Sequence, residues 1–177
     1  IAFFTTVLVT VMALTASAGF NFTHGAFRGG YVVPEDPLEN TFGLGAEVGL
    51  GIPVPHLNFA LEANYWTKNY TDEIFTSWEM SISDINIGLS AKYEFMVAPN
   101  TFYPYLGAGF GAHYFTTQID LGAISLSNTE TKFGVHSFGG FRVPVSPVVD
   151  AFVEARYTWV QPNYFGVFGG LGYRFGN

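Results

Sequence analysis

The sequence predicts an all-β fold, an eight-stranded antiparallel up-and-down β-barrel that spans a membrane. Three observations predict it. Apolar residues recur at every second position in one segment after another, which is the period of a β-strand. The positions between them hold mostly glycine and other small residues, and the 177-residue chain contains 21 glycines. Only 12% of the residues are charged while 18% are aromatic, a composition that suits an apolar solvent better than water.

The N-terminal segment, residues 1–18, is predicted to be a signal peptide rather than part of the barrel. Its apolar run ends in Ala16-Ser17-Ala18, the small-x-small pattern of a signal peptidase site. Cleavage after Ala18 would leave residues 19–177 as one transmembrane β-barrel domain. The basic region that normally precedes such a run is missing, so we expect a truncated start. The alternative is a short transmembrane anchor, for which a run of about 17 residues is at the lower limit of length.

The first four strands are predicted in residues 20–33, 41–52, 57–65 and 84–95. The first is the most ambiguous: if Arg28 shares a side with the glycines, then Phe27, Tyr31 and Val33 face the other way. In the second, "TFGLGAEVGLGI", the even positions are apolar and the odd positions from residue 43 hold four glycines and Glu47. The third and fourth, "LNFALEANY" and "DINIGLSAKYEF", alternate in the same way. Strands of about 9–11 residues cross a bilayer when tilted, and these segments meet that length.

The second four strands are predicted in residues 104–114, 133–143, 151–159 and 164–177. The alternation in "FGVHSFGGFRV" is weaker in its middle, whereas "PYLGAGFGAHY" and "AFVEARYTW" keep it throughout. In the closing segment one face carries Phe165, Val167, Leu171, Tyr173 and Phe175. The opposite face holds mostly glycine and a single arginine. The last segment therefore has one face suited to lipid and one that needs very little room.

The position of the charged residues indicates which face lies inside the barrel. Every charge in the seven clearest strands falls on the small-residue side, and none lies in an apolar row. A soluble barrel would show the reverse pattern. Lipid offers no hydrogen bonds to an exposed sheet edge, so a membrane-spanning sheet must close. Bacterial barrels have an even number of strands, which favours eight, and an eight-stranded interior is just wide enough for side chains to fill it.

The charged residues of the predicted lumen balance, with five acids against five bases. An isolated buried charge would be very costly, so we expect these residues to form a network of ion pairs. The network would plug the lumen; a narrow path for protons, water or ions is the alternative. Its predicted members are Arg28, Glu47, Glu62, Asp84, Lys92, Glu94, Arg142, Glu154, Arg156 and Arg174. Asp150 is placed in a turn outside this set.

The links between strands alternate in length. Long links are predicted at residues 34–40, 68–81 and 116–131, and short proline-containing links at 53–56, 96–103 and 144–149. Long loops outside the cell and short turns on the other rim are typical of outer-membrane barrels. The long loops give an acidic surface that could take a cationic partner, or divalent ions bridging to lipopolysaccharide phosphates. Their charged residues are Glu35, Asp36, Glu39, Asp72, Glu73, Glu79, Asp120 and Glu130 against Lys68 and Lys132.

On this patterning the chain resembles the small outer-membrane β-barrel families, the OmpA-type and OmpX-type proteins also described as porin family proteins. The resemblance covers nearly all of residues 19–177. It includes Leu171-x-Tyr173-x-Phe175, which is similar to the family's C-terminal signal for the barrel-assembly machinery, although Gly176 and Asn177 follow the phenylalanine here. The resemblance implies a monomer in the outer membrane of a Gram-negative cell envelope, surrounded by lipid and lipopolysaccharide.

The function predicted from the sequence is structural or surface-interacting, in envelope integrity or adhesion. A small transporter or channel for apolar or small solutes is the alternative, because Phe138, Phe152 and Phe168 are predicted to point into the lumen. A lipid A-modifying enzyme that uses a His–Ser pair is the less favoured alternative. We expect no catalytic residues, because His136 and Ser137 are adjacent and their side chains should lie on opposite faces of a strand. No cofactor or metal site is expected, since the chain has no cysteine and no dedicated calcium loop. The net charge of −7 argues against nucleic acid as a partner.

Overall fold

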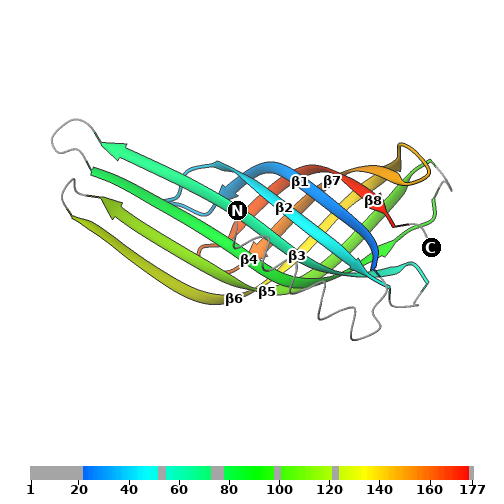
Figure 1. Cartoon of the computed structure of the whole chain (residues 1–177), viewed down its shortest axis with the longest axis horizontal. Helices are drawn as coiled ribbons and strands as arrows, with labels where there is room; N and C mark the ends of the chain where they lie inside the picture. Colours follow the sequence, from blue (N-terminus) through cyan, green and yellow to red (C-terminus); the bar gives the residue numbers. More distant parts are fainter. Residues whose placement is uncertain (1–21, 52–54, 73–77, 98–100, 121–123, 176–177) are drawn as a thin grey trace.

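The protein is a closed antiparallel β-barrel of eight strands in chain order, with β1 hydrogen-bonded to β8. The computed structural model describes residues 22–51, 55–72, 78–97, 101–120 and 124–175 (Figure 1). No helix among these residues has the length and apolarity needed to cross a membrane. The predicted fold class is confirmed. The predicted signal peptide, residues 1–18, lies outside the described residues.

Each predicted strand corresponds to one observed strand, including the ambiguous first one. The elements are β1 (Phe22–Pro34), β2 (Thr41–Leu50), β3 (Leu57–Asp72), β4 (Trp78–Glu94), β5 (Tyr103–Asp120), β6 (Ser125–Pro144), β7 (Val149–Trp159) and β8 (Tyr164–Arg174). Strands β2, β4, β6 and β8 end, and strands β1, β3, β5 and β7 begin, at the same end of the barrel (Figure 1). We call this end the turn end and the opposite one the ribbon end.

The outward face of the barrel is apolar and exposed, as the alternation predicts. Phe27 is 76% exposed, Phe133 86% and Leu171 60%. In water such a surface would be strongly unfavourable, whereas in a bilayer it faces acyl chains. Tyr31 and Val33 are also exposed, so the predicted orientation of the first strand is confirmed. The apolar rows of all eight strands thus form one continuous lipid-facing belt.

Glycines on the inward face make room for large side chains from neighbouring strands. A Cβ atom at Gly109 would collide with the imidazole of His136, its direct partner across β5 and β6. A Cβ at Gly170 would collide with the Phe152 ring from β7. Small barrels have little interior volume, so each bulky inward side chain requires a neighbouring residue without a side chain. This pairing explains the alternation of glycine with apolar residues.

The structure corrects the prediction of two long loops. Residues 68–72, 78–81, 116–120 and 125–131 belong to strands, and the pairing of β3 with β4 continues to Asp72↔Trp78. The pairing of β5 with β6 continues to Asp120↔Ser125. These segments contain five threonines together with Tyr70, Trp78 and Ile119, residue types that favour strands, and each hairpin satisfies its own backbone groups. These segments are polar because the strands continue beyond the lipid, and not because the chain forms loops there.

Strands β3 to β6 therefore extend past the rest of the barrel as a four-stranded sheet (Figure 1). We call this sheet, residues 67–72, 78–83, 116–120 and 125–129, the projecting ribbon. Pairing of β2 with β3 ends at Gly43↔Trp66, and pairing of β6 with β7 begins at Val135↔Trp159. Among the described residues, the ribbon thus has two edges without a neighbouring strand, residues 67–72 of β3 and 125–129 of β6, and the unpaired edge of β6 continues to Gly134.

Candidate functional site

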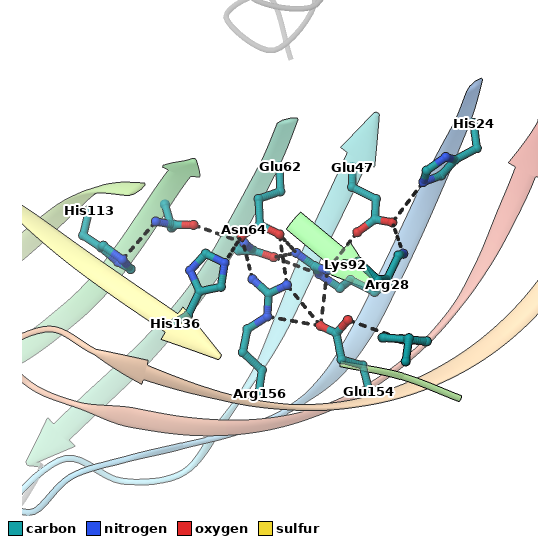
Figure 2. Close-up of polar contacts among 12 residues, drawn as sticks. His24, Arg28, Glu47, Glu62, Asn64, Lys92, His113, His136, Glu154 and Arg156 are labelled. Atoms are coloured by element: carbon teal, nitrogen blue, oxygen red, sulfur yellow. Dashed lines mark hydrogen bonds and ion pairs between the residues drawn. The ribbon is translucent and has the colours of Figure 1, made fainter. Parts of the chain in front are cut away.

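The candidate site is the lumen, where polar side chains form a chain of contacts along the barrel axis. Figure 2 shows them extending from His113 to His24, with Arg28 and Arg156 at the centre. The members come from strands far apart in sequence because inward positions of all eight strands meet in the lumen. Three sections follow each other: an aromatic layer at the ribbon end, an ion-pair centre, and a polar cavity at the turn end.

The ion-pair centre consists of Arg28, Glu62, Glu154 and Arg156, each at most 4% exposed. Glu62 accepts two parallel hydrogen bonds from Arg156, at 2.7 and 2.9 Å, and a third from Arg28 at 3.0 Å. Glu154 Oε1 lies 3.1 Å from Arg156 Nη2 and 3.4 Å from Arg28 Nη1. Two guanidinium groups and two carboxylates therefore neutralise each other. Buried charges are tolerated only with such partners, and removal of one partner typically costs about 3–5 kcal/mol.

Glu47 links this centre to the turn end. Its carboxylate lies 3.3 Å from Arg28, 3.2 Å from Lys92 and 3.3 Å from His24. Tyr105 adds a further contact, donating from its hydroxyl to Glu154 Oε2 at 3.3 Å. The structure thus brings Arg28, Glu47, Glu62, Lys92, Glu154 and Arg156, all expected from the sequence, into one connected cluster.

A second cluster surrounds Asp150 at the turn end, and here the structure corrects the sequence analysis. Arg142 pairs with Glu94, at 2.8 and 3.1 Å, and with Asp150 at 3.0 Å. Arg174 Nε lies 3.1 Å from the carboxylate of Asp150, a residue that is only 3% exposed. Asp150 was expected in a turn, but β7 already begins at Val149, so Asp150 occupies an inward position of the strand alternation.

Asp84 also differs from the expectation, because it meets no arginine or lysine among the described residues. Its Oδ2 accepts from His113 Nδ1 at 2.9 Å and from the Tyr164 hydroxyl at 3.3 Å. The Asn86 amide donates to His113 Nε2 at 2.9 Å. The Asn64 amide nitrogen donates to Asn86 Oδ1 at 3.2 Å, and Asn64 Oδ1 accepts from Arg28 at 2.7 Å. Asp84 therefore reaches the ion-pair centre only through His113 and two amides.

The sequence analysis did not identify the neutral members of the lumen. His24, Asn64, Asn86, Tyr105, His113, His136 and Tyr164 were not among the predicted network residues, yet all contact charged or polar partners inside the barrel. The available signal was their place in the alternation: each occupies an inward position of its strand. Searching for charges alone excluded uncharged hydrogen-bonding residues.

His136 and Ser137 lie on opposite faces of β6, as expected. His136 is 2% exposed, and its Nε2 lies 2.8 Å from Glu62 Oε1 without the alignment of a hydrogen bond. Ser137 is paired across the outward face with Ala108 and Tyr157. The sheet itself separates the two side chains, so this histidine cannot activate this serine directly.

Aromatic and aliphatic side chains fill the lumen at the ribbon end. Trp66 packs edge-on against Phe115 and Tyr164, with ring centroids 6.2 and 5.9 Å apart. Phe168, Val32 and Val160 complete this buried layer. The expected inward orientation of Phe138 and Phe168 is confirmed by their burial, while Phe152 is partly buried. Trp66 Nε1 and Asp84 Oδ1 are buried here without a hydrogen-bond partner among the described residues.

The lumen retains a cavity at the turn end. This cavity measures about 150 Å³ and is bordered by Glu47, Lys92, Glu94, Arg142 and Asp150. A second void, of about 10 Å³, lies among Asn64, Trp66, His136 and Thr158, close to the volume that one water molecule requires. Among the described residues, no group of three or more histidine, aspartate or glutamate side chains is arranged to hold a metal ion.

Comparison with protein families identifies one match. The family model described as the outer membrane protein beta-barrel domain matches residues 1–175. No curated protein matches the sequence.

Solved structures share the architecture at low sequence identity. Neisserial surface protein A superposes with a TM-score of 0.63 at 21% identity, covering 87% of this chain and 97% of that one. Ail, the attachment invasion locus protein of Yersinia pestis in complex with the heparin analogue sucrose octasulfate, gives 0.61 at 12% identity, with coverage of 86% and 99%. A major outer membrane protein from Thermus thermophilus gives 0.63 at 11%, with coverage of 85% and 99%. These likenesses show the fold.

Proposed function

The chain belongs to the outer membrane protein beta-barrel domain family and resides in the bacterial outer membrane, and from that premise we propose that it is a non-catalytic surface protein. The barrel is the anchor, and the projecting ribbon is the part that contacts partners outside the cell. The observation that carries this proposal is the ribbon itself, a sheet with two free edges above a lumen filled by paired charges.

The free edge of β6 supports a role in polypeptide recognition. Residues 125–134 have no β7 partner, so backbone amide and carbonyl groups on that side are available to an added strand. Exposed sheet edges are ready templates for strand addition, in which the main chain supplies affinity and the side chains supply specificity. The ribbon lifts this edge away from the membrane, where a partner can reach it.

Charge at the ribbon end favours a cationic partner. The two lysines there are already paired: Lys68 lies 2.8 Å from Glu39, and Lys132 lies 3.2 Å from Glu130. Glu35, Asp36, Glu79 and Asp120 form no ion pair among the described residues. A polyanion such as the heparin analogue that Ail binds would meet net repulsion here. A basic polypeptide, or divalent ions bridging to lipopolysaccharide phosphates, would be attracted.

Truncation of the ribbon tests this proposal. Replacing residues 68–82 and residues 117–128 each by Asn-Gly would close two tight hairpins on the pairs Thr67↔Ser83 and Thr116↔Thr129 and leave the barrel intact. In phosphatidylcholine nanodiscs, the full chain should bind labelled oligolysine and reject oligoglutamate. The truncated chain, which loses Glu79 and Asp120 but keeps Glu35 and Asp36, should bind oligolysine much more weakly. Equal oligolysine binding by both chains would refute a role for the ribbon.

A small transporter is the second candidate function, supported by open volume at both ends of the lumen. Besides the turn-end cavity, a recess of about 310 Å³ opens at the ribbon end beside Leu38, Ile82 and Phe115. Planar-bilayer recordings separate the two functions. An anchor with paired lumen charges should give no steady conductance, whereas large and stable openings would favour transport.

A further inference from the structure

The outward face of β3 to β6 changes character abruptly at one level of the sheet. We use "rung" for four residues directly opposite each other across these strands. Tyr65, Ile85, Tyr114 and Thr131 form the boundary rung. The next rung toward the turn end consists of Ala63, Ile87, Ala112 and Phe133, which lie in the lipid-facing belt. Tyrosine is enriched where lipid meets water, so the boundary rung marks the edge of the hydrocarbon.

The two rungs above this boundary contain only uncharged hydrogen-bonding side chains. They are Thr67, Ser83, Thr116 and Thr129, followed by Asn69, Ser81, Gln118 and Ser127. We call these eight residues the polar ladder. The third rung ends it with Glu79 directly opposite Asp120. Three hydrogen bonds of ladder side chains are present among the described residues: the Thr116 and Thr129 hydroxyls share one at 3.0 Å, Gln118 donates to Asp120 at 3.1 Å, and the Thr67 hydroxyl donates to the Ile82 carbonyl at 3.3 Å.

No lysine or arginine lies on the outward face of the described strands. The chain has seven lysines and arginines in total, and all seven occupy inward positions in the barrel or on the inner face of the sheet. They are Arg28, Lys68, Lys92, Lys132, Arg142, Arg156 and Arg174. Direct pairing of the outward face with phosphate or sulfate groups through these side chains is therefore excluded. The polar ladder also offers no apolar patch to a protein partner.

We propose that the polar ladder is a saccharide-contact face, on which the sugar chains of outer-leaflet lipopolysaccharide lie. Hydroxyl and carboxamide groups both donate and accept hydrogen bonds, which matches the neutral hydroxyl groups of sugars. The ladder continues the lipid-facing belt on the same strands and the same face, so its nearest neighbours in the membrane are the headgroup sugars of the surrounding lipid. Tyr65 and Tyr114 at its base add ring surfaces with polar tips.

The absence of charge on the ladder supports a covered face. Sheet edges without a neighbouring strand tend to pair with other chains, and proteins usually protect such edge strands with charged side chains, prolines or bulges, or cover them. On the ladder, charge begins only at Glu79 and Asp120, farther from the membrane. A layer of sugars would supply the protection that charged residues supply elsewhere. The inference concerns a sheet face and is independent of the strand edges that the proposed function uses.

The test is a titration of the full chain in phosphatidylcholine nanodiscs with delipidated, dephosphorylated core oligosaccharide from lipopolysaccharide. Amide NMR signals of the polar ladder should shift, and those of the inner face of the ribbon should not. The double variant Ser81→Ala/Gln118→Ala should raise the dissociation constant roughly tenfold, as expected for two lost hydrogen bonds. The matched control Thr117→Ala/Asn128→Ala, on the inner face of β5 and β6, should leave it unchanged.

Three results would overturn the inference. The oligosaccharide could produce no shift on the ladder, the control variant could weaken binding as much as the ladder variant, or binding could require the phosphates of intact lipid A. Pairing of two protein copies through the ladder in one nanodisc would also contradict it. Oligolysine binding by the Ser81→Ala/Gln118→Ala variant should remain normal, so this inference and the proposed function fail separately.

Discussion

Glu62 is one of the two acids that pair with both buried arginines of the ion-pair centre. It accepts hydrogen bonds from Arg28 and Arg156, and it contacts His136. The arginines hold the carboxylate in its ionised form, and the carboxylate in turn allows two guanidinium groups to be buried in a barrel whose wall is lipid. At the residue scale, the stability of the folded barrel therefore depends on every buried charge having its ion-pair partner.

Replacing Glu62 by glutamine tests this dependence. The side chain keeps its shape, but Arg28 and Arg156 are left with only Glu47 and Glu154 as acidic partners. We expect the free energy of unfolding to fall by about 3–5 kcal/mol, measured by urea denaturation in lipid vesicles. The matched control is Glu130→Gln, which removes an exposed pair with Lys132 and should cost about 0–1 kcal/mol. Equal effects of the two replacements would contradict the ion-pair centre.

Glycine replacements test the packing of the lumen. Gly109→Ala places a Cβ against His136 and the Leu89 carbonyl, so overpacking should cost about 1–3 kcal/mol. Gly169→Ala is the control, because its Cβ would meet nothing nearer than the Phe152 carbonyl oxygen at 3.9 Å. The fraction that runs as the folded species on unheated detergent gels reports both. A folded fraction for Gly109→Ala equal to that for Gly169→Ala would show that the lumen has spare room.

At the scale of elements, the sequence predicts every strand because each strand carries its own period of two. Even the ambiguous β1 is found where Arg28 and Phe27 assign it. Strand ends are less predictable, since Ser, Thr and Asn in residues 116–120 and 125–131 suit loops and projecting strands equally. Partners across the lumen are less predictable still. Asp84 contacts His113 rather than an arginine because of the stagger between strands. The residue pattern within one strand does not determine that stagger.

Cysteine labelling tests the orientation of these elements. The chain has no native cysteine, so Asn128→Cys places a single thiol on the inner face of the ribbon, away from the polar ladder, and Val97→Cys places one beside the β4–β5 turn. Both positions are exposed in the structure. On intact cells, a membrane-impermeant maleimide should label residue 128 and leave residue 97 unlabelled. Both should react after the cells are broken. Labelling of residue 97 on intact cells would reverse the proposed orientation.

At the scale of the whole molecule, two coupled patterns define the protein. Within the membrane the outward face is apolar and the inward face carries charge; in the projecting ribbon the outward face becomes polar, and Ile82 and Phe115 line the inner face. The alternation of inward and outward positions continues through the boundary rung. Beyond that rung the outward positions are polar, and apolar side chains lie on the inner face. The barrel thus matches lipid along one length of its strands and an aqueous or saccharide layer along the next.

The native tryptophans test this arrangement most directly. The chain has three tryptophans; Trp159 is 47% exposed on the outward face, and Trp66 is 3% exposed inside the lumen. One variant, Trp66→Phe/Trp78→Phe, retains only Trp159, and another, Trp78→Phe/Trp159→Phe, retains only Trp66. In vesicles with brominated acyl chains, fluorescence should be strongly quenched in the first variant and nearly unchanged in the second. Quenching of Trp66 with sparing of Trp159 would place lipid on the wrong face of the sheet and contradict the account.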